Sequence, residues 1–145
     1  MKVISIRALR LLPLTLTLPV LIVAGCMTVH PSAPATYQQV VPLLENNCVH
    51  CHGQQRLPSM PPLTDTAALA TLIGPGKLIV PGHPDSSRLL RVVTLADDQA
   101  GSMPPTGHAI SPREIELLRA WIESGAPLPA ENIALTPRGA PPRSR

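Results

Sequence analysis

The sequence predicts a small all-α domain, and three observations lead to this fold class. Four stretches carry apolar residues at helical spacing, and loops containing Pro or Gly separate them. The last stretch begins with a capping box and ends at a glycine. The chain has 145 residues with no Phe, one Trp and one Tyr, so its apolar core is small. A domain with so small a core usually needs a covalent staple or a cofactor.

Residues 1–25 have the features of a targeting segment. Three basic residues, Lys2, Arg7 and Arg10, precede an apolar run over residues 11–24. This run is shorter than the roughly 20 residues that a membrane-spanning helix needs, and two prolines interrupt it. We therefore expect a bacterial signal peptide that is removed on export.

The apolar run ends at Val23-Ala24-Gly25-Cys26, which resembles the lipobox of bacterial lipoproteins. The resemblance implies cleavage before Cys26 and acylation of this cysteine, so that several acyl chains hold the protein on the periplasmic side of a membrane. Met27 stands where inner-membrane retention would favour Asp, which makes the outer membrane the expected location. Residues 26–35 then form a short linker.

The formal net charge of +3 belongs to the precursor. Removal of the three basic residues of the signal peptide leaves nine Lys and Arg against nine Asp and Glu. The mature chain is therefore near neutral, and we expect no nucleic-acid partner.

Three helices are predicted in the first part of the folded domain. The first follows an N-cap at Thr36, and Pro42 either kinks it or marks its start. The second spans about 65–72 and the third about 84–93, with an extended stretch and a Pro-Gly turn between them. The apolar residues expected to face the core are Tyr37, Val40, Val41, Leu44, Leu69, Leu72, Leu89, Leu90 and Val93.

The last helix has the clearest boundaries. Ser111-Pro112-Arg113-Glu114 is a capping box with Pro at the first helical position, and Gly125 is expected to cap the other end. Its apolar stripe consists of Ile115, Leu118, Trp121 and Ile122. The domain is thus predicted over 36–127. Residues 128–145, rich in Pro, Ala and Arg, are predicted to be disordered.

Cys48-Val49-His50-Cys51-His52 is the C-x-x-C-H pattern of covalent c-type haem attachment. On a helix, Cys48 lies three residues before Cys51 and four before His52, so the three side chains share one face. Two thiols can then form thioethers with the haem vinyl groups while the imidazole points at the iron from the same side. With Cys26 assigned to lipid, this pattern uses every remaining cysteine.

Further motifs extend the pattern from about residue 37 to 127. They are the helix that leads into Cys48, the stretch Pro81-Gly82-His83-Pro84 with Ser87, Leu89 and Arg91, the loop Met103-Pro104-Pro105, and the capped last helix. Together they resemble the mono-haem class I cytochrome c fold, and in particular the planctomycete-type cytochrome c domain. The resemblance implies a small helical domain wrapped around one covalent haem c. It also implies thioethers at Cys48 and Cys51, His52 as proximal iron ligand and Met103 as distal ligand.

The sixth iron ligand has alternatives in the sequence itself. Prolines after Met103 stiffen its loop, and a methionine thioether would raise the reduction potential. Met60 has the same Pro-Pro context but lies only eight residues after the haem motif. His83, His108 or a water molecule are further alternatives. Separately, Arg88 and Arg91 are candidates either for pairing with haem propionates or for a solvated helix face.

The leading functional hypothesis is a membrane-anchored mono-haem cytochrome that carries single electrons between periplasmic or membrane redox proteins by Fe(III)/Fe(II) cycling. We expect an electron carrier without a small-molecule substrate, acting alone or as a subunit of a larger oxidoreductase, and the sequence does not identify its partners. The alternative is a haem enzyme or sensor with an open or labile sixth iron site. A third hypothesis is a thiol or zinc lipoprotein that uses Cys48, Cys51, His50 and His52.

Overall fold

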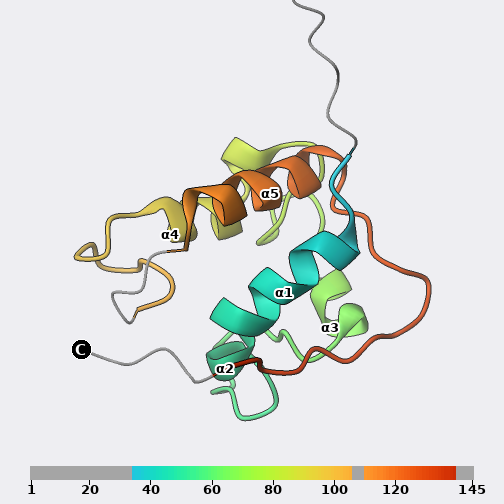
Figure 1. Ribbon diagram of the computed structural model, residues 1–145, viewed down its shortest axis with the longest axis horizontal. Coiled ribbons are helices and arrows are strands. Elements are labelled where there is room, and N and C mark those ends of the chain that lie inside the picture. Colours follow the sequence, from blue (N-terminus) through green and yellow to red (C-terminus); the bar gives the residue numbers. More distant parts are fainter. Residues whose placement is uncertain (1–33, 106–109, 140–145) are drawn as a thin grey trace, which may run out of the picture. The chain divides into compact units, whose positions relative to one another are not determined.

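The computed structural model describes residues 34–105 and 110–139, whose course is drawn in Figure 1. The expectations for the signal peptide, for Cys26 and for most of the linker lie outside the described residues. The same holds for His108 and for the end of the tail. None of the described helices combines the length and the apolar run that a membrane crossing requires.

The described part of the chain is all-α, as the sequence predicts. It contains isolated β-bridges but no strand. Its elements are α1 (Tyr37–Asn47), α2 (Val49–His52), α3 (Thr66–Thr71), the 3-10 turn η1 (Pro84–Ser86), α4 (Arg88–Thr94) and α5 (Pro112–Glu123). Helix α5 packs against both α1 and α4, and α1 leads directly into α2 (Figure 1).

Helix α1 begins where its capping residues predict. The Thr36 backbone N–H donates to Oε1 of Gln39 at 2.8 Å, which satisfies one donor at the helix start. Pro42 lies inside the helix and is exposed. Its ring removes the hydrogen bond to the carbonyl of Gln38, which is also exposed, so water can replace the lost donor.

The third predicted helix is divided into two parts. Ser87 is extended, with φ −82° and ψ 115°, and separates η1 from α4. Its buried hydroxyl accepts from the Val80 N–H at 2.8 Å and lies 3.1 Å from the carbonyl oxygen of His83. These contacts replace helical hydrogen bonds at Ser87, which is why the prediction of one continuous helix was wrong.

Helix α5 follows its sequence signals closely. The Ser111 N–H donates to Oε2 of Glu114 at 3.0 Å, and the Glu114 N–H donates to Oγ of Ser111 at 3.3 Å. The helix is capped at Ser124, and the next residue, Gly125, has φ +98° and turns the chain out of it.

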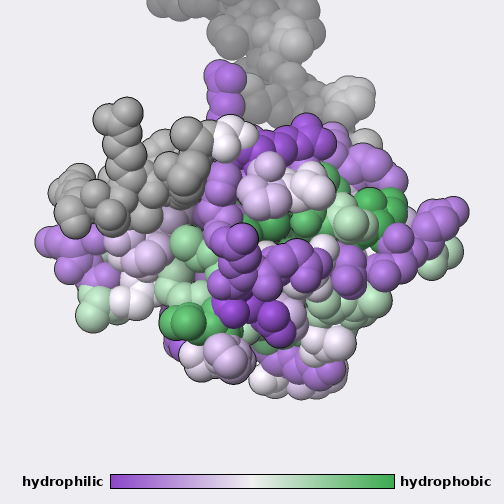
Figure 2. All heavy atoms as spheres, turned by 90° about the horizontal axis from the view of Figure 1, so that it is seen from below, coloured by the Kyte–Doolittle hydropathy of each residue, from purple (hydrophilic) through white to green (hydrophobic). Residues whose placement is uncertain are grey.

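The apolar core is formed by residues of α1, α3, α4 and α5 together with residues of the segments between them. Trp121 is fully buried, and its indole N–H donates to the Pro127 carbonyl at 3.0 Å, so it is a core residue with its one polar atom satisfied. Polar side chains cover much of the face shown in Figure 2, with smaller apolar areas between them. Other buried apolar residues include Val40, Leu43, Leu44, Leu69, Ile79, Leu89, Leu90, Val93, Leu118 and Ile122.

The tail prediction was wrong for residues 128–139, which pack against the domain. Residues 131–138, here called the C-terminal strap, run past α3 and α2 as the red segment of Figure 1. Leu135 is only 3% exposed, and its N–H donates to the Thr64 carbonyl at 2.9 Å. The Thr136 N–H donates to Oε1 of the buried Glu45 at 3.0 Å, and Arg138 forms an ion pair with Glu45. Ordering this segment costs conformational entropy, and its Pro- and Ala-rich composition led us to expect disorder. The buried leucine, the hydrogen bonds and the ion pair offset that entropy cost.

Candidate functional site

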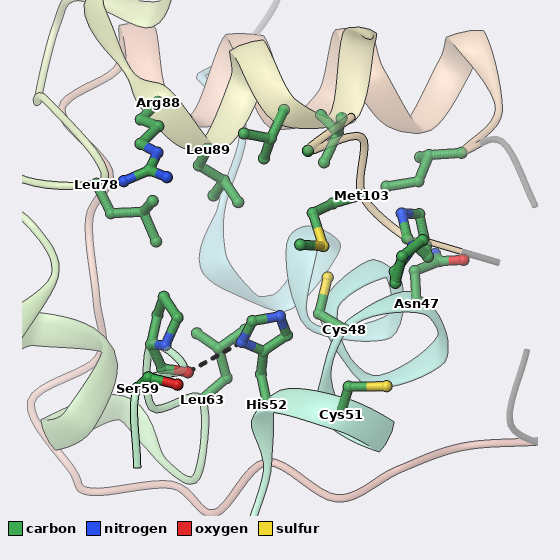
Figure 3. Close-up of a pocket in the computed structure, with 17 residues that line it drawn as sticks. Asn47, Cys48, Cys51, His52, Ser59, Leu63, Leu78, Arg88, Leu89 and Met103 are labelled. Carbon is green, nitrogen blue, oxygen red and sulfur yellow. Dashed lines mark hydrogen bonds between the residues drawn. The ribbon is translucent and has the colours of Figure 1, made fainter. Parts of the chain in front are cut away.

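A cavity of about 270 Å³ lies between the α1–α2 junction and α4 (Figure 3). It is lined by the two cysteines and the second histidine of the C-x-x-C-H pattern, by Met103, and by a largely apolar wall. The wall includes Leu63, Leu78, Leu89, Val92, Val93 and Ile110.

The haem motif forms one helical turn, as its spacing predicts. The Cys51 and His52 N–H groups donate to the Cys48 carbonyl at 3.2 and 3.0 Å. This turn places the side chains of Cys48, Cys51 and His52 along the same cavity. The turn ends at Gly53, and a Cβ at this position would lie 2.5 Å from the Val49 carbonyl oxygen, so a larger residue does not fit without a backbone shift.

The two thiols differ in environment. Cys51 is exposed at the cavity rim, whereas Cys48 is partly buried. Burial, followed by the neighbouring Cys51 and Glu114, raises the pKa of the Cys48 thiol to about 12. Such a thiol stays protonated at neutral pH, which is unfavourable for thiolate-based zinc binding or dithiol redox chemistry.

His52 is oriented by the loop that follows it. Its Nδ1 lies 3.1 Å from the Pro61 carbonyl oxygen, the dashed contact in Figure 3. Because a carbonyl only accepts, Nδ1 carries the proton in this contact, and the neutral ring keeps its lone pair on Nε2. A hydrogen bond from the ring nitrogen that does not bind the metal fixes the tautomer and the orientation of a metal-ligating imidazole.

Met103 lies on the opposite wall, on the loop after α4. Its N–H donates to the Val92 carbonyl at 2.9 Å, and its side chain points toward Cys48 and His52 in Figure 3. Met60 is not among the residues that line the cavity. Its N–H donates to the Leu57 carbonyl within the preceding loop.

The other histidines lie elsewhere. His83 is exposed and does not line the cavity, and His108 is outside the described residues. The Nε2–H of His50 donates to the Arg138 carbonyl oxygen at 2.9 Å, which ties the haem motif to the C-terminal strap. Within the described ranges, no group of three or more His, Cys, Asp and Glu could hold a metal ion.

Two polar lining residues, Asn47 and Ser59, were not assigned to the site from sequence. Asn47 and Ser59 carry no sequence signal that distinguishes them from ordinary surface residues. Arg88 was one of two candidate arginines, and the structure places it on the cavity wall while Arg91 does not line the cavity.

The residues present fit a covalently attached haem. The apolar wall suits a flat macrocycle, two thiols stand at one end, and an imidazole and a thioether face each other across the space. An all-α domain that places two cysteine thiols, an imidazole and a thioether around an apolar cavity has the features of a c-type cytochrome.

Comparison with known families agrees with this class. Residues 48–107 match the family model described as Planctomycete cytochrome C. This segment is therefore a planctomycete-type cytochrome c domain, and the cofactor of the domain is covalently bound haem c. Searches of curated proteins and of solved structures found no match to the chain.

Proposed function

We propose that the chain is an exported, lipid-anchored mono-haem cytochrome that carries single electrons between redox proteins. The cytochrome c domain supports haem-based electron transfer. The observation that carries the proposal further is that one cavity presents the His52 imidazole and the Met103 thioether from facing walls.

Cys48 and Cys51 would hold the haem covalently. Each cysteine S–H would add across a vinyl C=C bond of the haem, so that a thioether joins the sulfur to one vinyl carbon and the thiol hydrogen is retained on the other. No oxidant and no leaving group are required, but both thiols must be reduced. The raised pKa of the Cys48 thiol and the exposure of Cys51 are compatible with two free thiols at this stage.

His52 and Met103 would be the protein ligands of the haem iron. The haem supplies the one-electron Fe(III)/Fe(II) couple, and a thioether ligand raises its potential. The Pro61 carbonyl holds the His52 ring, and the bond to Val92 holds the Met103 backbone. With both ligands supplied by the protein, the iron would have no position left for a substrate, which favours an electron carrier over an enzyme.

The membrane anchor rests on sequence features alone. Residues 1–25 have the organisation of a signal peptide, and Cys26 closes the lipobox-like sequence. An acylated Cys26 would place the domain on a short tether at the periplasmic side of a membrane, with the outer membrane as the expected location. The electron donor and acceptor would be redox proteins that reach this surface.

The experiment is expression of the full chain in a bacterium that attaches haem c. The proposal predicts haem staining on a denaturing gel, a reversible one-electron titration, and no rapid carbon monoxide binding by the reduced protein. Rapid carbon monoxide binding would contradict closed ligation and favour the haem enzyme or sensor. Cys26→Ser should release the protein from membranes; continued membrane attachment would contradict the anchor.

A further inference from the structure

Arg88 is a cation on an otherwise apolar part of the cavity. It is the first residue of α4, and in Figure 3 it lies beside Leu78 and Leu89, at the end of the cavity away from Cys51. A cation gains nothing from the dipole at the start of a helix, so helix stability does not explain this residue.

The guanidinium of Arg88 has no acidic partner among the described residues. The ion pairs within residues 34–105 and 110–139 join Arg119 to Asp85 and Arg138 to Glu45. The titratable groups on the described cavity wall are the two thiols, the imidazole of His52 and the guanidinium of Arg88. Among the described residues, the cavity therefore presents one positive charge without an acidic partner, at the end opposite the thiols.

The chemistry of haem supplies the matching anion. A haem carries two vinyl groups on one edge and two propionate carboxylates on the opposite edge. Thioethers at Cys48 and Cys51 would fix the vinyl edge at the α1–α2 junction, which directs the propionate edge toward the other end of the cavity. A carboxylate beside Leu78 and Leu89 needs a hydrogen-bonding partner, and a guanidinium binds carboxylates in a bidentate manner.

We propose that Arg88 binds a haem propionate and thereby raises the reduction potential of the haem. This inference rests on the proposed function, because it requires haem attached at Cys48 and Cys51. The ferric haem carries one more positive charge than the ferrous haem, so a nearby cation disfavours the oxidised state. The same cation keeps the propionate ionised across neutral pH.

Arg91 provides a matched control. It lies three residues further along α4 and is exposed, as Arg88 is, but it does not line the cavity. Arg88→Gln and Arg91→Gln therefore remove the same charge from the same helix, but only the first removes it from the cavity wall. Arg88→Lys keeps the charge and loses the bidentate geometry.

The test is a redox titration of the full-length haem-loaded protein and these three variants at several pH values. We expect Arg88→Gln to shift the ferric–ferrous equilibrium roughly threefold to tenfold toward the ferric state. This corresponds to a fall in potential of about 28–59 mV for a one-electron couple. The potential of this variant should also rise as pH falls, because the unpaired propionate takes up a proton nearer neutral pH. Arg88→Lys should restore part of the potential.

Equal reduction potentials for Arg88→Gln and Arg91→Gln would overturn the inference. The inference would also be overturned if the reduction potential of Arg88→Gln depended on pH in the same way as that of the unaltered protein. In both cases haem staining and one-electron titration of the unaltered protein would still support the proposed function. Absence of covalent haem in the unaltered protein would instead contradict the proposed function itself.

Discussion

The ion pair between Glu45 and Arg138 offers a quantitative test of how the C-terminal strap is held. The Glu45 side chain is 4% exposed and that of Arg138 is 58% exposed. Oε1 of Glu45 accepts from the Thr136 N–H and hydroxyl, whereas Oε2 is buried and, among the described residues, has Arg138 as its partner. Arg138→Met keeps much of the aliphatic stem but leaves this carboxylate oxygen without its cation.

The magnitude follows from the burial of the two partners. A hydrogen bond to a charged group contributes about 1.5–3 kcal/mol, whereas exposed ion pairs contribute about 0.2–1 kcal/mol. Because Glu45 is buried and Arg138 is half exposed, we expect Arg138→Met to lower the free energy of unfolding by about 1–2 kcal/mol. Glu45→Gln should cost a similar amount, since an amide still accepts from Thr136 but does not pair with Arg138.

The assay is urea unfolding of the haem-loaded protein, with each variant compared at an unchanged m-value. In the double variant the second substitution should cost little, which gives a coupling energy of about 1 kcal/mol. Arg113→Met, at an exposed position of α5, is the control and should stay within about 0.5 kcal/mol of the unaltered protein. A value for Arg138→Met equal to that of this control, or additive costs of the two substitutions, would show that the ion pair does not hold the strap.

Further predictions concern the core, the haem motif and the one tyrosine. Leu135→Ala should destabilise the protein by about 2–3 kcal/mol in urea unfolding, because Leu135 is buried. Ile133→Ala, at a position 40% exposed, should cost less than 1 kcal/mol, and equal costs would argue against a packed strap. Gly53→Ala should reduce the yield of haem-loaded protein, because the added Cβ meets the Val49 carbonyl oxygen; an unchanged yield on haem-stained gels would contradict this. Burial, Glu45 and Asp65 raise the pKa of the Tyr37 hydroxyl above 10.0. The native protein should therefore show a tyrosinate absorbance midpoint at higher pH than the urea-unfolded chain, and the stability contributed by the protonated hydroxyl should be lost as pH rises above about 10. Equal midpoints in the two states would show that Tyr37 is not buried.

Helix positions were predictable because their signals are local. The capping residues at Thr36 and Ser111 and the glycine after α5 lie within a few residues of the helix ends that they define. The break at Ser87 was not predictable, because its hydroxyl bonds to Val80 across a turn that sequence spacing does not reveal. The ordered C-terminal strap was not predicted for the same reason, because Arg138 pairs with Glu45, a residue far from it in the sequence.

In the candidate site, too, the local features were predictable from sequence and the features that depend on the path of the chain were not. The common face of Cys48, Cys51 and His52 follows from helical spacing within five residues. The choice between Met103 and Met60 required the path of the chain, because both stand before two prolines and only Met103 lines the cavity. The choice between Arg88 and Arg91 likewise required the position of α4. The Pro61 carbonyl that orients His52 has no sequence signal beyond its proximity to the motif.

We infer that His52 and Met103 bind one covalently attached haem from facing walls of the cavity. The most direct measurement is the ferric absorption spectrum of the haem-loaded protein beside those of Met103→Ala and Met60→Ala. We predict a low-spin spectrum with a methionine–iron band that Met103→Ala abolishes and Met60→Ala leaves intact. A band that survives Met103→Ala, or that disappears in Met60→Ala alone, would contradict it.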